Sequence, residues 1–591
     1  MYGVAAEVRA VSIRGSLGLL AVVALVSCAA PAAPTTSPSA ASSTGVSGAP
    51  KKTTVTLGVS ATIDAFSYAQ AGTTAGGGFS FYELWLQGLV TAGVTNPAPE
   101  ARIAREVPSL DNGGAQLLPD GRMKVTWRIR PEVKWADGAD LTAHDYVFGF
   151  EVVKDRDNPM VGVAQISTLY QVVESVEAID AKTLVVNWSR PHYQFDAMGF
   201  ALQPFPSHVL RAIWDQRNLD AMANHPYWRE DYFQVGPYRP VKFEPAVEII
   251  LEPVPGYFLG KPKIDRVIIK QFADPVALYA AVQARTIDVT PENALRDENA
   301  IDLKAQWERS GEGTVYIGFG GSRAIFPQFK PELQAEPALF DPRVRQALMV
   351  ALDREAWTGA MLAGQTQNTT WSLLPPGDRL YEVTKDSYRA YAYNPQQALR
   401  LLDEAGWVRG SDGALANRSD GRRLRIEIRG GTGSEASILA DGWKQLGVDA
   451  PQQIIAAALL NDREVAQNYT GVEIAARGYG DQLLTRAECA NRPIPPRFSG
   501  LNRGHYCNSA MDDLIGNYRA SLTTPEQARW MREIVALYTQ ELPAMQLFFG
   551  LNHPSVVKGF NALQADFAGG LQPSGFYGSY FRNSHLWEWT S

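Results

Sequence analysis

Apolar and polar side chains alternate most regularly between residues 123 and 130, where every second residue from Met123 to Ile129 is apolar. A period of two predicts a half-buried β-strand, and Pro131 ends it. Residues 141–154 then read as a helix, with Thr142 and Asp145 spaced as a capping box at its start. The chain therefore changes from a strand pattern to a helix pattern within a few residues.

Similar patterns recur along the rest of the chain. Asp341-Pro342 and Asn394-Pro395 each combine a capping side chain with a proline suited to a first helical turn, and an apolar stripe follows each. Gly406 is expected to end the second of these helices, and another is predicted from Thr524 to about Glu541. Strand-like segments at 248–251 and 264–270 lie between the helical ones, which indicates an α/β architecture.

The N-terminal residues follow a different pattern. Arg9 and Arg14 precede an apolar run from Leu17 to Val26, which is typical of a secretory signal and is shorter than the about 20 residues that span a bilayer. The sequence Leu25-Val26-Ser27-Cys28 resembles the bacterial lipobox, which implies lipidation of Cys28 and a location outside the cytoplasmic membrane. An ordinary signal peptide that contains a cysteine is the alternative.

Composition separates a linker from the body. Residues 29–50 are almost entirely Ala, Pro, Ser, Thr and Gly, which predicts a flexible arm. The longer part that follows has ordinary globular composition, and the net charge of the chain is −7. With no long basic stretch in the body, we expect no nucleic-acid partner.

Cysteine and histidine usage bears on redox and metal chemistry. Cys489 and Cys507 are the cysteines left besides Cys28, and they can form a disulfide or stay as two thiols. Neither has a His or a second Cys at metal-ligand spacing, so we expect no metal site and no cofactor. The sequence also lacks a nucleophile elbow, a zinc-protease pair and a phosphate loop, which favours a binding protein over an enzyme.

Several segments together resemble extracytoplasmic solute-binding protein family 5, which serves ABC transporters for peptides, nickel and related solutes. The blocks occur in the family's order from about residue 53 to the C-terminus; they are 127–138 with 141–145, 235–238, 256–265, 341–354 and 401–407. The resemblance implies an α/β fold of the periplasmic-binding-protein-like type II, with two lobes, a hinge and an extra subdomain on lobe I. Solute binding by lobe closure is the function that it implies.

The resemblance also implies boundaries for each part. They are residues 1–27 for the signal peptide, 28–52 for the lipidated Cys and flexible linker, 53–91, 232–311 and 548–591 for lobe I, 92–231 for its subdomain, and 312–547 for lobe II. The family implies a monomer that docks on an ABC permease and its ATPase.

The ligand site is expected where family members contact their solutes. The segment Ala476-Arg477-Gly478-Tyr479-Gly480-Asp481 resembles the segment of peptide-binding members, with Asp481 as the partner of a ligand α-amino group. It is one residue shorter than theirs, and Gln482 stands where they have an aromatic residue. The implied ligand-binding residues are Gly77, Gly78, Phe79, Tyr82, Trp371, Arg477, Tyr479 and Asp481.

Alternatives stay open for these residues and for the function. Tyr82 and Trp371 can be packing residues, and Asp481 can be a loop or cap residue. The leading hypothesis is import of di- or oligopeptides. Binding of a nickel chelate, an opine or an oligosaccharide is the alternative within the same fold, and a hydrolase or a sensor or adhesion lipoprotein would be a reuse of that fold.

Overall fold

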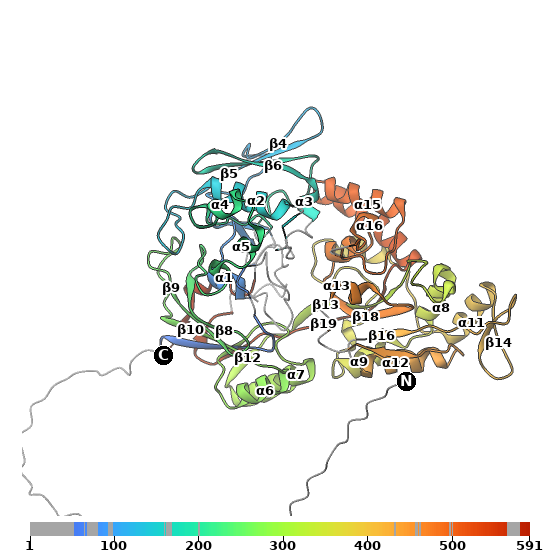
Figure 1. The fold of residues 1–591 in the computed structure, drawn as a ribbon. Coiled ribbons are helices and arrows are strands. Elements are labelled where there is room, and N and C mark those ends of the chain that lie inside the picture. The colour runs from blue at the N-terminus through green and yellow to red at the C-terminus, as the bar shows by residue number, and fades with distance from the viewer. Residues whose placement is uncertain are drawn as a thin grey trace, which may run out of the picture. The chain divides into compact units, whose positions relative to one another are not determined.

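A seven-stranded, a four-stranded and a five-stranded sheet organise the part of the chain that the structure describes (Figure 1). The computed structural model describes residues 52–590 except 64, 68–80, 93–97, 156, 159, 161–167, 199–200, 431–432, 456–458, 460–461, 496–497, 499 and 564–578. Cys28, Gly77, Gly78 and Phe79 therefore lie outside the described residues. Within that described part, no helix is both long and apolar enough to cross a membrane.

The seven-stranded sheet joins segments from both ends and the middle of the chain. Its order is β12-β20-β11-β1-β10-β9-β8, and β1 runs parallel to β10 and β11. Its strands are β1 (Thr54–Val59), β8 (Tyr238–Glu244), β9 (Glu248–Pro253), β10 (Arg266–Gln271), β11 (Val289–Thr290), β12 (Gly313–Val315) and β20 (Ser555–Val557). Three helices contact strands of this sheet, namely α1 (Tyr82–Trp85), α6 (Pro275–Gln283) and α7 (Asp297–Ser310).

The turn before β8 shows why a glycine is needed there. A Cβ atom on Gly236 would lie 2.2 Å from the backbone carbonyl carbon of Trp85, so a side chain would push α1 away from the sheet. Tyr238, two residues later, is buried in the same core as Trp85. The Gly-Pro-Tyr segment thus anchors α1 to the seven-stranded sheet.

The four-stranded sheet has the order β4-β5-β7-β6 and is antiparallel throughout. Its strands are β4 (Ala115–Leu117), β5 (Met123–Arg128), β6 (Val173–Asp180) and β7 (Thr183–Trp188), with helices α2 (Ala143–Lys154), α3 (Thr168–Val172), α4 (Ser207–Asp215) and α5 (Leu219–Ala223). The predicted strand and capping box are confirmed, since the Thr142 amide donates to Asp145 Oδ2 at 2.9 Å.

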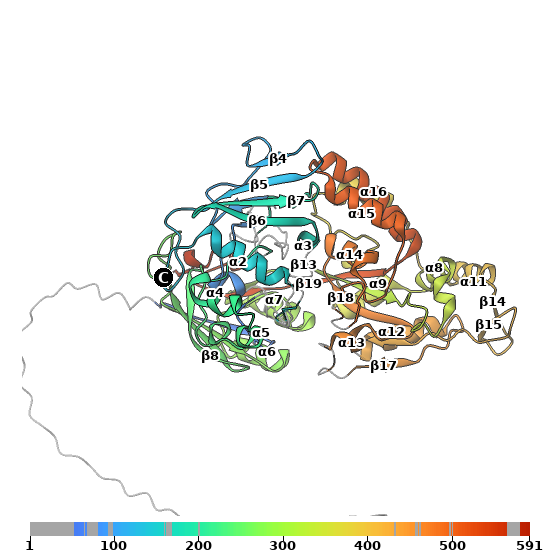
Figure 2. The same ribbon diagram turned by 45° about the horizontal axis from the view of Figure 1, so that its top comes forward.

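The five-stranded sheet lies between two groups of helices (Figures 1 and 2). Its order is β17 (Gln452–Ile454), β16 (Ile428–Gly430), β18 (Val472–Arg477), β13 (Gly318–Pro327) and β19 (Met545–Asn552). One apolar core joins its first face to α8 (Pro342–Val350), α9 (Arg354–Met361), α11 (Pro395–Glu404) and α12 (Gly433–Lys444). A separate core joins its second face to α14 (Asp481–Thr485), α15 (Ser509–Ala520) and α16 (Thr524–Glu541).

The predicted helix starts in this region are confirmed. Asp341 accepts from the Arg343 amide at 2.8 Å, and Asn394 accepts from the Gln397 amide at 3.0 Å. Gly406 follows the second helix with φ +88°, a conformation that glycine adopts without strain. Local capping chemistry therefore sets these helix boundaries.

Shorter elements complete the described chain. They are α10 (Tyr381–Thr384), α13 (Arg463–Gln467), the pairs β2 (Val90–Ala92) with β3 (Pro99–Ala101), β14 (Trp407–Arg409) with β15 (Leu415–Asn417) and β21 (Phe560–Asn561) with β22 (Glu588–Trp589), and the 3₁₀ turns at 226–228, 337–340, 366–368, 385–387, 489–491 and 584–586.

The chain passes between the seven-stranded and five-stranded sheets a few residues later than the implied boundaries. β12 extends to Val315, past the implied boundary at 311, and β19 extends to Asn552, past the one at 547. Strand pairing decides these positions, because β12 pairs with β20 and β19 pairs with β13.

Candidate functional site

Three of the implied ligand residues lie at the sharp turn from β18 to α14: Arg477 ends the strand, Tyr479 lies in the turn and Asp481 begins the helix. Gly480 has φ +57° and its amide donates to the Leu373 carbonyl at 2.9 Å, which fixes the turn to a neighbouring loop. A Cβ atom on Gly478 would lie 1.9 Å from Gln482 Oε1. Both glycines thus let the chain pass from strand to helix while Arg477 and Asp481 stay close in sequence.

Tyr479 is partly buried in this turn. Its ring meets Phe549 of β19 edge-to-face at 6.3 Å between centroids, and burial followed by the nearby Asp378 carboxylate raises its pKa. The phenol therefore stays neutral near neutral pH and can offer a hydrogen bond and an aromatic face.

Trp371 and Tyr82 make packing contacts. The Arg354 guanidinium lies 4.1 Å from the Trp371 ring centroid, and Arg354 also donates to the Thr370 carbonyl at 2.7 Å. Tyr82 is 4% exposed and packs edge-to-face with Trp85. Tyr82 is thus buried among its neighbours, whereas Trp371 stays partly exposed beside Arg354.

Asp481 belongs to a buried group that we name the Arg519 cluster, made of Arg519, Asp481 and Glu488. Arg519 Nε donates to Asp481 Oδ1 at 2.8 Å, and its Nη1 donates to Glu488 Oε1 at 2.7 Å. The side chains are 4%, 11% and 15% exposed respectively. Burial lowers the pKa of Arg519, but the two carboxylates outweigh burial and raise it overall. Two carboxylates share one guanidinium, which leaves a formal charge of −1.

A second group, which is partly buried, has the opposite composition, and we name it the Glu473 cluster. It consists of Glu473, Arg429, Arg477, Arg486 and Arg503. Glu473 and Arg429 are register partners on neighbouring parallel strands, and Arg477 lies four residues further along β18 on the same face. Arg429 donates to Glu473 Oε1 at 2.9 Å, and Arg477 donates to Oε2 at 2.8 Å.

The electrostatics of the Glu473 cluster follow from one carboxylate facing several cations. Burial raises the pKa of Glu473, but Arg477, Arg429 and Arg503 outweigh burial and hold that pKa below its ordinary value. Burial, and then the nearby Arg477 and Arg503, lower the pKa of Arg486. The four guanidinium groups and one carboxylate give a formal charge of +3.

A disulfide closes the loop that completes this cluster. Cys489 and Cys507 are bonded across a sequence separation of 18, and the loop between them contains Leu501 and Arg503. The Leu501 carbonyl accepts from Arg486 Nη1 at 3.0 Å. The disulfide thus ties down the loop that contacts Arg486.

Sequence reasoning reached Arg477 and Asp481 and missed their partners. Arg429, Glu473, Arg486, Arg503 and Arg519 come from five separate places in the sequence, and no short motif joins them. The spacing of Glu473 and Arg477 within a strand pattern could have shown that both lie on one face. The other contacts depend on tertiary structure.

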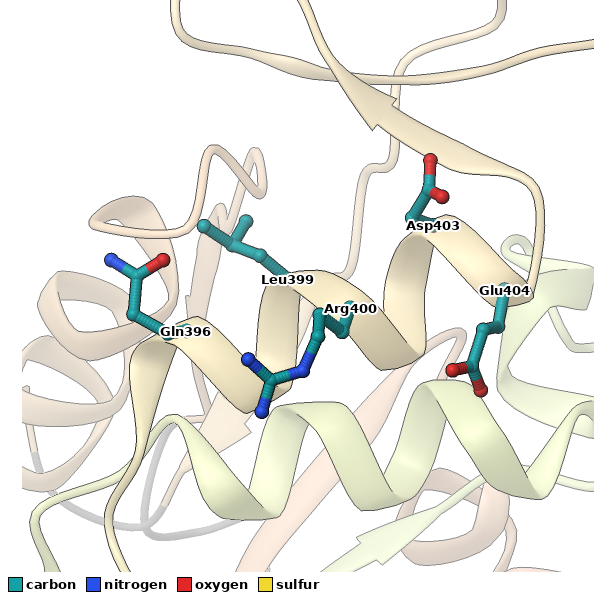
Figure 3. A pocket seen from close by; sticks show the side chains of 5 residues that line it. All are labelled: Gln396, Leu399, Arg400, Asp403 and Glu404. Carbon is teal, nitrogen blue, oxygen red and sulfur yellow. The ribbon is translucent and has the colours of Figure 1, made fainter.

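A shallow depression on α11 is a separate feature. Figure 3 shows its lining side chains on this one helix, namely Gln396, Leu399, Arg400, Asp403 and Glu404. Ligand sites in proteins are usually concave and built by several elements, so this depression is a poor candidate. Among the described residues, no group of three or more His, Cys, Asp or Glu side chains is placed to hold a metal ion.

Comparison with known proteins assigns the family. The model of bacterial extracellular solute-binding proteins, family 5, matches residues 117–481, more than half of the 591 residues. The chain belongs to this family. A putative ABC transporter peptide-binding protein from Brucella ovis is 28% identical over 294 residues, which cover 49% of this chain and 50% of that protein, so the chain spans about half the length of this curated relative. The dipeptide-binding protein of Escherichia coli is 25% identical over 500 residues, which cover 77% of this chain and 85% of that protein.

Solved structures establish the fold of this family 5 member. The oligopeptide-binding protein of Thermus thermophilus, complexed with a pentapeptide, has a TM-score of 0.73 at 20% identity and covers 91% of this chain and 96% of its own. NikZ of Campylobacter jejuni, in complex with Ni(L-His), has a TM-score of 0.71 at 20% identity, and the match covers 91% of this chain and 99% of NikZ. The expected α/β fold of the periplasmic-binding-protein-like type II is confirmed.

Proposed function

We propose that this family 5 protein is the substrate-binding lipoprotein of an ABC importer. It captures extracytoplasmic di- or oligopeptides by closure of its two lobes and delivers them to a membrane permease that works with an ATPase. Its relatives by sequence and by fold include proteins named for dipeptide and oligopeptide binding, which supports a peptide as the solute. Relatives of this kind bind solutes for transport, so we propose a binding role and no catalysis.

One observation carries the peptide hypothesis. The turn from Arg477 to Asp481 joins a cluster of formal charge +3 to a cluster of formal charge −1. A peptide carries an ammonium group at one end and a carboxylate at the other, so it matches a site with opposite charges on neighbouring sides. In this proposal Asp481 receives the ligand amine, since Arg519 alone does not neutralise both Asp481 and Glu488.

Contacts from the subdomain support a closing mechanism. The Tyr193 amide donates to the Arg519 carbonyl at 2.8 Å, and the Tyr193 ring lies 5.1 Å from that of Tyr518. The residue that holds Asp481 is therefore also a contact of the subdomain. A ligand that adds contacts on both sides would stabilise the closed state over the open one.

Native mass spectrometry of the purified full-length protein tests the proposal, with sequencing of any released ligand. We expect a mixture of short peptides, and we expect Asp481→Asn to lose them. Glu488→Gln is the matched control, because it removes the other carboxylate from Arg519 without removing the proposed amine partner. Equal loss in both variants would mean that Asp481 only positions Arg519, and a single non-peptide ligand would overturn the peptide hypothesis.

A non-peptide solute is the second candidate. The fold is shared with NikZ, whose structure holds Ni(L-His), and the Glu473 cluster carries more cations than a simple peptide end requires. An anionic chelate or opine would use that excess of positive charge. The same mass measurement separates this candidate from the first, because such a ligand has one defined mass.

The lipid anchor is a separate part of the proposal, carried by the lipobox-like residues that end at Cys28. In cells grown with radiolabelled palmitate, we expect the full-length protein to carry label and to partition with membranes. Cys28→Ser should abolish both, with Cys489→Ser as the control for a cysteine of another kind. Label that persists in Cys28→Ser would contradict the proposed anchor.

A further inference from the structure

The subdomain and the helices beside the five-stranded sheet exchange one apolar side chain each. Tyr193 follows β7 of the four-stranded sheet, but its side chain packs against the core that α15 and α16 build on the five-stranded sheet. Leu522 lies between α15 and α16, but it packs against the core of the four-stranded sheet. Each part thus completes its apolar packing with a partly buried residue of the other.

Two hydrogen bonds join the same surfaces, and both ribbon views show α3 next to α15 there (Figures 1 and 2). The Tyr193 amide donates to the Arg519 carbonyl at 2.8 Å. Arg519 lies in the last turn of α15, where carbonyl groups lack the amide donors of a continuing helix. Gln171 Nε2 of α3 donates to Asn491 Oδ1 at 3.4 Å. The subdomain therefore caps the end of a helix that belongs to the other part.

Stacked rings hold Tyr193 in position from the subdomain side. Trp188 is fully buried at the end of β7 and stacks on His192 with ring centroids 5.8 Å apart, and His192 stacks on Tyr193 at 5.2 Å. Burial, followed by the charge of Arg519, lowers the pKa of His192, so its ring stays neutral beside that arginine. The subdomain thus presents Tyr193 on a rigid support, and its ring meets that of Tyr518 at 5.1 Å.

These contacts are separate from the two chain crossings between the seven-stranded and five-stranded sheets. The crossings lie between β12 and β13 and between β19 and β20. Short crossings of this kind allow two parts to rotate about them, so contacts elsewhere decide whether the parts stay together. The contact of Tyr193 and Leu522 uses the end of α15 and its connection to α16, rather than the turn from Arg477 to Asp481. Different residues thus serve the proposed solute site and the contact between the parts.

From these contacts we propose that Tyr193 and Leu522 form a latch that holds this protein closed in the absence of solute. Opening would expose both apolar side chains to water, so their burial favours the closed state by itself. The inference goes beyond the proposed function, because the latch contributes equally to the binding of every solute. A solute then supplies only the part of the closing free energy that the latch does not.

Hydrogen–deuterium exchange at the Tyr193 amide tests the latch directly, because this amide donates across the contact. The full-length protein is stripped of solute by unfolding in urea and refolding without reductant, and native mass spectrometry verifies that no solute is bound. We expect the Tyr193 amide to exchange slowly in the stripped protein. Exchange at the rate of an unprotected amide would overturn the proposal, because the contact would then require a solute.

Leu522→Ala weakens the latch from the opposite side and leaves the Tyr193 amide itself in place. Loss of most of the leucine side chain should speed exchange at the Tyr193 amide by about tenfold. Leu117→Ala is the matched control, because Leu117 is 52% exposed on β4 of the subdomain. Unchanged exchange in Leu522→Ala, or an equal increase in Leu117→Ala, would contradict the latch.

A second variant covers the case in which Leu522→Ala disturbs the fold, which would appear as lost protection in β13. Tyr193→Ala removes the subdomain's side of the latch and should increase the radius of gyration of the stripped protein, measured by small-angle X-ray scattering. Tyr393→Ala, at a tyrosine that is 49% exposed, should leave the radius unchanged. An unchanged radius in Tyr193→Ala would overturn the proposal. Neither measurement uses a solute, so the latch can fail while peptide binding stands, and peptide binding can fail while the latch stands.

Discussion

The Arg519 cluster and the Glu473 cluster are built from the same residue types, but carboxylates outnumber arginine in the first and arginines outnumber the carboxylate in the second. In the Arg519 cluster one guanidinium serves two carboxylates through bonds of 2.8 and 2.7 Å. In the Glu473 cluster one carboxylate accepts hydrogen bonds from the guanidinium groups of Arg429 and Arg477. Arg486 and Arg503 belong to the same cluster but donate to no carboxylate among the described residues. The Arg519 guanidinium is neutralised within the protein, whereas Arg486 and Arg503 are not. The comparison teaches that the ratio of arginine to carboxylate, rather than burial alone, sets the net charge of each cluster.

The largest effect is expected from breaking the Arg519 cluster. Arg519→Met leaves Asp481 and Glu488 buried without their cation, which should destabilise the protein by about 3 to 5 kcal/mol. Urea-induced unfolding followed by tryptophan fluorescence measures the loss. Arg486→Met is the matched variant from the other cluster, and a similar loss there would remove the contrast between the clusters.

Removing the disulfide should loosen the loop that contacts both Arg486 of the Glu473 cluster and Glu488 of the Arg519 cluster. A double Cys489→Ser, Cys507→Ser variant opens a loop with a sequence separation of 18, at a cost of about 3 kcal/mol in the chain-entropy model. Urea-induced unfolding measures this loss. Treatment of the unmodified protein with a reductant is the parallel measurement, and an unchanged unfolding free energy in both would contradict a stabilising role for the loop.

A smaller effect, with a distinct pH dependence, is expected for Glu473→Gln. Loss of the charge should cost about 2 kcal/mol at neutral pH, because the introduced amide would still accept a hydrogen bond from one arginine. Since the folded protein holds the pKa of Glu473 below its ordinary 4.5, this carboxylate stabilises the fold above that value, and the stabilisation is lost as the pH falls below it. The stability difference from the unmodified protein should therefore shrink below about pH 4.5, and a constant difference would contradict the assignment.

Glu488 in the Arg519 cluster sharpens that test, because its pKa is raised whereas that of Glu473 is lowered. Burial raises the pKa of Glu488, and Arg519 offsets this only in part. A raised carboxyl pKa means that the folded state binds the proton more strongly, so this group adds stability as the pH falls towards its ordinary value and removes it as the pH rises. Stability curves of Glu488→Gln and Glu473→Gln should thus deviate from the unmodified protein in opposite directions on acidification.

The smallest effect serves as a baseline for both clusters. Arg529 and Glu533 form an exposed pair on α16 at 3.7 Å, with side chains 67% and 48% exposed. Glu533→Gln should change the unfolding free energy by less than about 0.5 kcal/mol, because solvent screens the pair. A larger change would mean that the effects in the clusters do not depend on burial.

The sequence predicted the fold well and the site only in part, for physical reasons. Capping at Thr142, Asp341 and Asn394 is local, so the helix starts follow from residues that are neighbours in the chain. The blocks of the family signature likewise lie within short segments. The Glu473 cluster draws on residues from 429 to 503, and only strand register brings Arg429 beside Glu473. Tyr82 shows a further difficulty, since an aromatic residue near an expected pocket can be buried by packing against its neighbours.

The seven-stranded sheet has a consequence for the time at which this protein can fold. Its strand β1 belongs to one core with Val556, Phe581 and Trp587, which the ribosome adds some 500 residues later. At roughly 5 to 20 residues per second, the first strand waits roughly 25 to 100 s for these partners. The buried core of the four-stranded sheet, by contrast, uses only residues up to Val235 and can form earlier. Completion of the seven-stranded sheet therefore has to wait until synthesis is nearly finished.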